Sequence, residues 1–262
     1  MRLPHLTMLA LLSPFVAALL PASIQAAPIT YLDATDGPGG NTRLASGGEF
    51  LALRGSPIGN DNQWSLRPFA NGGGVFTTND GTPSGPEDGP GLVTSITGLI
   101  PGGAYEVFAF FWSDSNNWRL KSSLTAMPPL GDDPSVSFSA NGAAGATDAP
   151  TATGADFAGP VLIGEGNRIM LRADLGLALA TSSGEIRVWI DDFANTTAGN
   201  RTWYDGVGYA LVPEPSAIAL ASLLVVAMWG RPASRHAEQI ARFLIAGSGK
   251  TVFTGRDASQ RH

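Results

Sequence analysis

Glycine and proline recur so densely along this chain that they exclude coiled coils and helical bundles. The 262 residues include 33 Gly and 19 Pro, and that much of either residue repeatedly breaks helices. Short apolar or alternating runs lie between the breaks, which come at intervals of roughly 8 to 15 residues, as in sandwiches and barrels. The 12 Phe, 6 Trp and 4 Tyr suffice for one sizeable core. We therefore expect an all-β fold, a single antiparallel β-sandwich.

Twelve runs are expected to form strands, and three of them have clear patterns. Residues 105–112 carry large apolar side chains at odd and even positions, which predicts a central strand covered on both faces. In 185–191, alternation places apolar side chains on one face and Arg187 and Trp189 on the other. The glycines of 203–210 indicate a bulge or a close backbone approach. The full set of expected strands is 29–32, 49–53, 64–69, 75–78, 92–97, 104–112, 118–124, 135–139, 160–163, 168–173, 185–191 and 202–211.

No stretch has a convincing helical period. Residues 171–180 come closest, but their glycine and mixed spacing leave the assignment ambiguous. We expect surface loops at 72–74, 80–91 and 141–159. None of these loops separates two self-sufficient cores, so one folded domain is expected.

The N-terminus has the three-part layout of a secretory signal peptide. Arg2 precedes an apolar run at 6–20, and the segment 21–26 ends in Ala26. We expect a signal helix within residues 1–26 and cleavage after Ala26. A buried helix or a membrane anchor is the weaker alternative, because the run has about 15 residues and a membrane span needs roughly 20.

A second targeting signal is predicted near the C-terminal end of the chain. Its residues are Val212, Pro213, Glu214, Pro215 and Ser216, followed by an uncharged stretch at 217–230 and then by Arg231 and Arg235. This order resembles the PEP-CTERM sorting signal of Gram-negative bacteria, in which a Pro-Glu-Pro motif precedes a short membrane helix and a basic cytoplasmic stop. The resemblance implies a membrane helix at about 216–230 and an exosortase-type enzyme that cuts near the motif. The alternative is an exposed turn before an ordinary buried helix.

The two addresses together divide the chain. They predict an exported domain at 27–212, a sorting signal at 213–235 and a cytoplasmic, disordered tail at 236–262. The arginines after the apolar stretch favour an N-out, C-in orientation. We therefore expect a precursor anchored in the inner membrane, with the sorting enzyme as partner, that is later placed on the cell surface or in the extracellular matrix. The tail runs further past its arginines than is usual in the family.

Charge and composition exclude several functions for the expected exported segment. Residues 27–212 hold 19 Asp and Glu against 9 Lys and Arg, a net charge of −10, which argues against nucleic acid as a partner. The chain has no Cys, and its three histidines lie outside this segment. Serine–histidine hydrolysis, thiol nucleophiles and the usual zinc ligands are therefore excluded.

Carboxylate chemistry stays open, because a glycosidase needs only two Asp or Glu across a cleft. The acids closest to aromatic residues are Asp114, Asp191, Asp192 and Asp205. Nothing in their spacing separates catalytic partners from solvated turn residues. We therefore assign no catalytic residue.

Two acidic turn sequences offer the oxygen ligands that calcium prefers. Asp33 and Asp36 lie in one, and Asp191 and Asp192 lie in the other. Neither has the EF-hand pattern, and Asp is also an ordinary turn residue. A structural calcium stays open beside plain turns, and no other cofactor is expected.

Tryptophan side chains are the other candidates for binding, because a flat indole suits the apolar face of a sugar ring. Trp118 follows a polar loop and has Asp114, Asn116, Asn117 and Arg119 around it in sequence, while Trp189 lies opposite the apolar row of its strand. Of the tryptophans in the segment, these two are the best candidates for an accessible indole that binds glycan, although burial in the core is the favoured interpretation for each.

The expected function follows from these candidates. We expect an exported, non-enzymatic module that binds glycan, such as exopolysaccharide, or serves as a structural component of the envelope or extracellular matrix. The alternative is a carboxylate-dependent glycan-processing enzyme.

Two short segments resemble known β-sandwich families. Residues 99–107 resemble the turn and strand of fibronectin-type sandwiches, and 184–192 resemble the penultimate strand of concanavalin-like or laminin-G-like jelly rolls. Both resemblances imply a β-sandwich, and the second implies a jelly-roll-like topology.

Overall fold

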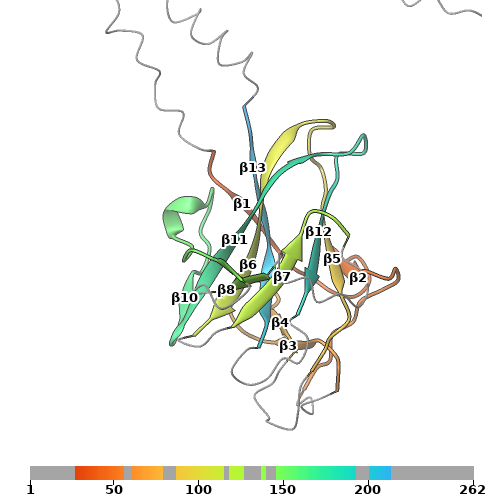
Figure 1. Ribbon diagram of the computed structural model, residues 1–262, viewed down its shortest axis with the longest axis vertical. Helices are drawn as coiled ribbons and strands as arrows, with labels where there is room; N and C mark the ends of the chain where they lie inside the picture. Colours follow the sequence, from red (N-terminus) through yellow and green to blue (C-terminus); the bar gives the residue numbers. More distant parts are fainter. Residues whose placement is uncertain are drawn as a thin grey trace, which may run out of the picture. The chain divides into compact units, whose positions relative to one another are not determined.

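The computed structural model describes residues 27–55, 61–78, 87–114, 118–126, 137–139, 146–192 and 201–213. These residues form an all-β fold of curled, largely antiparallel sheets (Figure 1). The chain divides into two units, residues 1–212 and 213–262, and every described residue except Pro213 belongs to the first. The expected signal helix, membrane helix and tail lie outside the described residues. Among the described residues, no helix is long and apolar enough to cross a membrane.

One sheet has seven strands and is built around the longest strands of the chain. Its order is β10 (Gly164–Glu165), β11 (Arg168–Leu179), β6 (Ala104–Ser113), β13 (Trp203–Leu211), β4 (Val75–Thr77) and β3 (Ser65–Arg67), and β1 (Thr30–Asp33) also pairs with β13. All of these pairings are antiparallel. The first and last strands of the described domain therefore lie side by side.

The second sheet has six strands. Its order is β2 (Thr42–Leu44), β5 (Leu92–Ile96), β12 (Ile186–Asp191), β7 (Arg119–Ser123), β8 (Ser137–Ser139) and β9 (Thr147–Asp148). Its pairs are antiparallel except for β8 with β9.

Side chains from both sheets meet in one hydrophobic core. β6 contributes Val107, Ala109 and Phe111, and β12 contributes Val188 and Ile190 to the same cluster. The alternation predicted for β12 is confirmed, because its apolar row is buried while Arg187 is exposed and Trp189 is half-buried.

The other face of β6 is covered as well, as its sequence predicts. Phe108, Phe110 and Trp112 belong to a second cluster, which also contains Ala152 and Phe157. The described part of the surface loop expected at 141–159 is mostly exposed, but it also covers part of this sheet, which the sequence did not predict. Ala152 and Phe157 pack against this face of the seven-stranded sheet, and Ile29 forms a parallel bridge with Phe157.

The strand assignments need correction at several other places. Residues 49–53 contribute only single bridges, at Glu49 and Leu53, and 160–163 form no strand. The short strand β2 has no apolar signal in the sequence and was not expected. Residues 171–180 are the second half of β11, whose mixed spacing reflects a register shift between Asp174 and Gly176.

Candidate functional site

The indole of Trp118 is buried, which rules it out as an accessible candidate. Its exposed fraction is 1%. The ring packs against Trp203 at 5.0 Å between centroids, and the guanidinium of Arg201 lies 5.1 Å from its centroid. Arg168 also lies over the ring, at 5.7 Å. These contacts occupy the indole, and an apolar sugar face has no route to it.

The sequence neighbours of Trp118 give no support for a glycan site around this residue. Asn116 and Asn117 lie outside the described residues, whereas Asp114 and Arg119 are half-buried. The backbone amide of Arg119 donates to the carbonyl of Arg201 at 3.2 Å. The polar loop before Trp118 suggested exposure, but the covering residues Trp203 and Arg201 come from a distant part of the chain.

Trp189 lies where the sequence places it, on the outer face of the six-stranded sheet. It is half-buried, and it lines a hollow of about 460 Å³. Its cross-strand neighbours are Val93 on β5 and Ser123 on β7. The hollow is also lined by Leu124, Ala178, Leu179, Thr181, Ser183, Glu185, Ile186 and Arg187.

A fixed polar pair borders this hollow. The Nε of Arg187 donates to Oε1 of Glu185 at 2.8 Å, and the hydroxyl of Ser95 donates to the same oxygen at 2.9 Å. The hydrogen bond from Arg187, followed by that from Ser95, lowers the pKa of Glu185. The hollow thus combines a partly exposed indole with a held carboxylate and an exposed guanidinium, which can bond hydroxyl groups of a ligand.

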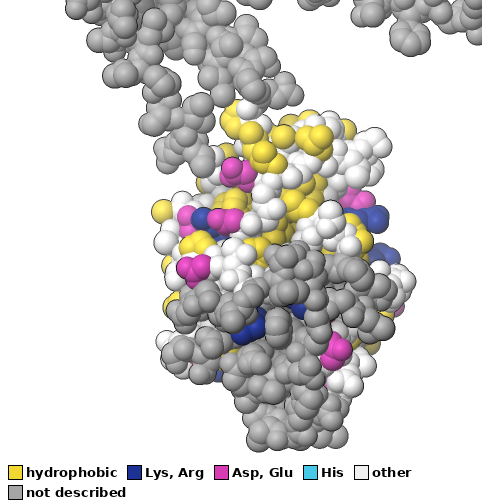
Figure 2. All heavy atoms as spheres, in the orientation of Figure 1, with side chains coloured by type: hydrophobic (Ala, Val, Ile, Leu, Met, Phe, Trp, Pro, Cys, Tyr) yellow, Lys and Arg dark blue, Asp and Glu magenta, His cyan; other side chains and the backbone are white. Residues whose placement is uncertain are grey.

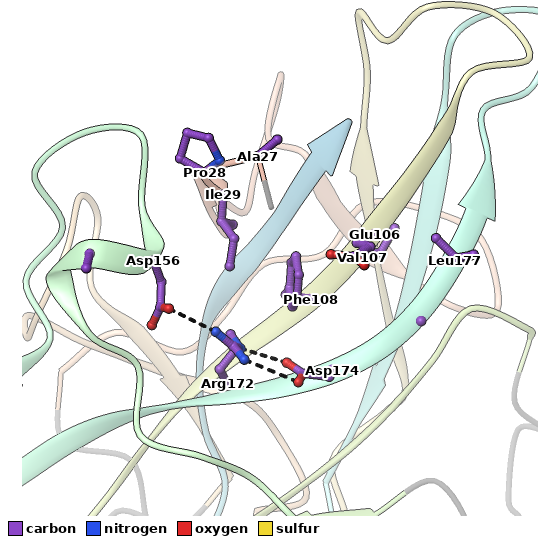
Figure 3. Close-up of a pocket in the computed structure, with 12 residues that line it drawn as sticks. Ala27, Pro28, Ile29, Glu106, Val107, Phe108, Asp156, Arg172, Asp174 and Leu177 are labelled. Carbon is purple, nitrogen blue, oxygen red and sulfur yellow. Dashed lines mark hydrogen bonds and ion pairs between the residues drawn. The ribbon is translucent and has the colours of Figure 1, made fainter. Parts of the chain in front are cut away.

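A larger cleft of about 810 Å³ lies on the outer face of the seven-stranded sheet. Figure 3 shows it between the N-terminal residues Ala27 to Ile29, the segment at Asp156 and the strands β6 and β11. Arg172 occupies its centre. The guanidinium pairs with Asp156 at 3.1 Å and with Asp174 at 2.7 Å.

The ion pairs of Arg172 decide what this cleft can do. Asp156 and Asp174 are held by the same cation, whereas the third carboxylate of the lining, Glu106, is exposed. The hydrogen bond with Asp174 is the largest contribution to the raised pKa of Arg172. Arg172 also lies 5.4 Å from the centroid of Phe108 and covers that ring. The cleft therefore offers polar contacts and no free aromatic face among its described lining residues.

The four acids considered for calcium do not gather around one point. Asp33 accepts from the amide of Gly73 at 2.8 Å, whereas Asp36 accepts from Arg54 at 2.7 Å. Asp191 lies 3.8 Å from the ammonium of Lys121, and its neighbour Asp192 accepts from the amide of Gly89 at 3.1 Å. Within the described ranges, no group of three or more acidic or histidine side chains could hold a metal ion.

A buried acidic cluster joins β1, β13 and the turn at 71–74. The hydroxyl of Tyr31 lies 2.8 Å from Oδ2 of Asp205 and 3.1 Å from Oδ1 of Asp33. The amide of Asn71 donates to the same Oδ2 of Asp205 at 3.2 Å. Burial is the main cause that raises the pKa of Asp205 to about 7. The sequence marks Asp205 by its aromatic neighbours but does not reveal this partnership.

Two of the acids considered for catalysis are inaccessible. Asp192 and Asp205 are each 0% exposed, so neither can touch a substrate. The remaining two, Asp114 and Asp191, are half-buried.

A comparison with protein-family models finds no match, and a comparison with curated protein sequences finds none either.

Proposed function

We propose that the chain is an exported, surface-sorted and non-enzymatic domain, a jelly-roll-like β-sandwich that binds glycan through the hollow at Trp189. The observation that carries the proposal is the half-buried indole of Trp189 on an open sheet face, beside the Glu185–Arg187 pair. An aromatic face with a few oriented polar groups is the usual composition of a small-ligand site. A sugar ring presents an apolar face to the indole and hydroxyls to the polar pair.

Binding is favoured over catalysis by the state of the carboxylates. A glycosidase needs one carboxyl that donates a proton and a second that acts as nucleophile or base. In the large cleft, Asp156 and Asp174 share the cation of Arg172. At the hollow, Glu185 is paired with Arg187, and its pKa is lowered. The hollow thus has a single carboxylate among its described lining residues, and two of the three carboxylates in the cleft are tied to one cation, which favours binding over a mechanism with two carboxylates.

The proposed location rests on the two sequence addresses. The signal-like segment ending at Ala26 supports export, and the resemblance of 212–235 to a PEP-CTERM signal supports membrane anchoring and processing by an exosortase-type enzyme. On the surface or in the matrix, exopolysaccharide is the glycan that the domain would meet. A purely structural role in the envelope is the alternative outcome.

Retention of the domain on immobilised host exopolysaccharide tests the glycan site. Trp189→Ala should abolish retention and leave the melting temperature nearly unchanged, because a half-exposed ring adds little to the core. Leu51→Ala, at a side chain that is 64% exposed, is the matched control and should bind as the parent does. Equal retention of Trp189→Ala and the parent would exclude the hollow as the site.

Trp118→Ala provides the opposite comparison. Deleting this buried indole should destabilise the domain by about 3 to 5 kcal/mol, the usual cost for a buried Trp. Urea unfolding of the two tryptophan variants measures the contrast. If Trp118→Ala lost retention without losing stability, the sugar platform would be at Trp118 instead.

A further inference from the structure

Four segments without charged residues meet at one end of the domain, the end at which β13 finishes and the chain leaves the domain at residue 213. Residues 27–32, 97–105, 175–184 and 206–213 contain no Asp, Glu, Lys or Arg. Other uncharged runs occur in the sequence, such as 68–79 and 134–147, but these four segments are distinguished by lying at one end of the fold. We define these segments as the uncharged tip.

Strand pairing and turn hydrogen bonds bring the four segments to one end. Ala104 pairs with Leu179 across β6 and β11, and its carbonyl accepts from the amide of Val212 at 2.9 Å. The amide of Gly102 donates to the carbonyl of Ala180 at 3.0 Å. β1 runs antiparallel to β13 with Thr30 opposite Tyr209, so the N-terminal residues lie at the same end.

The uncharged tip also exposes large apolar side chains. Ile100 is 59% exposed, Leu177 67%, Leu179 71% and Leu211 42%. In Figure 2, the upper end of the described domain is mostly yellow and white, and it is the end where β13 finishes in Figure 1. One exposed charge interrupts this end of the domain, because Glu106 on β6 lies opposite Leu177 on β11 and opposite Ala210 on β13. Clustered exposed leucines of this kind mark an interaction surface.

The short connection between the tip and the uncharged stretch at 217–230 points to a lipid surface as the partner of the tip. Four residues, Pro213 to Ser216, separate Val212 from the uncharged stretch at 217–230. Five Cα steps span at most about 18 Å. The headgroup layer on one side of a bilayer takes up roughly 5 to 8 Å of that distance. If residues 217–230 enter the bilayer, the tip has little room to leave the membrane surface.

From these observations we infer that the uncharged tip rests on the lipid surface while the domain is anchored, with Ile100 and Leu211 reaching into the interface. The inference rests on the proposed membrane anchoring of the precursor. Aliphatic side chains gain free energy when they leave water for the interfacial region. The four segments carry no charge to desolvate, and the carboxylate of Glu106 between them stays hydrated in the headgroup layer. The acidic remainder of the domain then faces away from the membrane.

The absence of cysteine in the chain makes the test direct. Single Ile100→Cys and Leu211→Cys variants of the full-length gene are expressed without an exosortase, so that only the host signal peptidase acts. The purified chains are reconstituted into phosphatidylethanolamine–phosphatidylglycerol vesicles and labelled with a fluorophore. Gln63→Cys is the matched control, because Gln63 is exposed and lies away from the tip. It precedes β3, whose Ser65 pairs with Thr77 on β4, and Thr77 in turn pairs with Trp203 at the start of β13. The tip lies at the other end of β13.

Labels at Ile100 and Leu211 should be several-fold less quenched by aqueous iodide than the label at Gln63, and more quenched by headgroup nitroxide lipids. Adding Ile100→Glu to the Leu211 reporter should reverse both effects, because a carboxylate resists transfer into the interface. Equal iodide quenching at both ends of vesicle-bound chains would overturn the docking while leaving the anchor intact. Failure of the chains to float with the vesicles would overturn the anchor and the docking together. Protection that persists in detergent and grows with protein concentration would assign the tip to a second copy of the chain and overturn the lipid assignment.

Discussion

At the scale of single residues, the most unusual chemistry is the buried contact of Tyr31 with two carboxylates. The hydroxyl of Tyr31 lies within donating distance of Asp205 and of Asp33, and its one proton cannot satisfy both carboxylates when both are ionised. Burial raises the pKa of Asp33 as well as that of Asp205. Burial, together with the charges of both carboxylates, also raises the pKa of Tyr31, which keeps its proton at every physiological pH.

This arrangement predicts that the domain loses stability as the pH rises. The folded chain holds a proton on Asp205 up to a pH of about 7, whereas the unfolded chain releases it near 3.8. The free energy of unfolding should therefore fall between about pH 4 and pH 7 and level off above that window. At 1.36 kcal/mol per pKa unit the contribution of this group is worth up to roughly 4 kcal/mol.

Asp205→Asn should remove most of this pH dependence, because an amide mimics the protonated acid. Urea unfolding at pH 5 and pH 8 measures the effect. Asp148→Asn, at an exposed carboxylate on β9, is the control and should behave as the parent. A parent domain that is more stable at pH 8 than at pH 5, with Asp205→Asn unchanged from it, would contradict the assignment of the proton to Asp205.

At the scale of elements, the contact between the first and last strands depends on one missing side chain. A Cβ at Gly206 would lie 2.4 Å from the carbonyl oxygen of Leu32, and the register of β13 against β6 shifts between Tyr204 and Gly206. The glycine pattern of 203–210 indicated a bulge or a close approach, and both are confirmed.

Gly206→Ala should displace β1 from β13. Backbone rather than a flexible side chain must move, so we expect a loss of about 1 to 3 kcal/mol, the usual cost of overpacking. Hydrogen exchange of the β1 amides should accelerate along with the fall in unfolding free energy. Gly159→Ala is the control, since a Cβ there meets no atom within 4 Å; equal stability of the two variants would refute the close approach.

The elements also show which features sequence patterns can predict. β6, β12 and β13 were predicted nearly to the residue, because burial on one or both faces leaves a clear period in their side chains. The strand β2 was missed because Thr42 to Leu44 has no such period. The covering segment around Phe157 was taken for a loop, since only scattered apolar residues in a run rich in Gly, Ala and Thr reach the sheet.

In the candidate site, too, the features set by local sequence were predictable and those set by long-range contacts were not. The half-exposed position of Trp189 follows from alternation within its own strand, so sequence sufficed. The burial of Trp118 depends on Trp203 and Arg201, and the cluster at Asp205 depends on Tyr31 and Asn71. Contacts of this kind join residues far apart in the chain, and no local pattern records them.

At the scale of the whole molecule, the segments that the proposed export and sorting would remove join the domain at its uncharged tip. β1 begins at Thr30, and the last backbone hydrogen bond of β13 in the described residues is from the amide of Val212. Cleavage after Ala26 and near Glu214 would therefore leave both sheets complete. Cleavage at the second position would also separate the domain from the proposed membrane anchor.

We accordingly predict that, in a host with an exosortase, the mature protein begins at Ala27 and ends near Glu214. Its melting temperature should match that of the anchored precursor in detergent, because no paired strand residue is lost. Intact mass of the surface or released form determines both ends, and calorimetry compares the stabilities. A surface-attached chain that still carries His262 would refute the processing while leaving export in place. A melting temperature several degrees lower in the processed form would mean that residues after 214 pack as part of the folded domain.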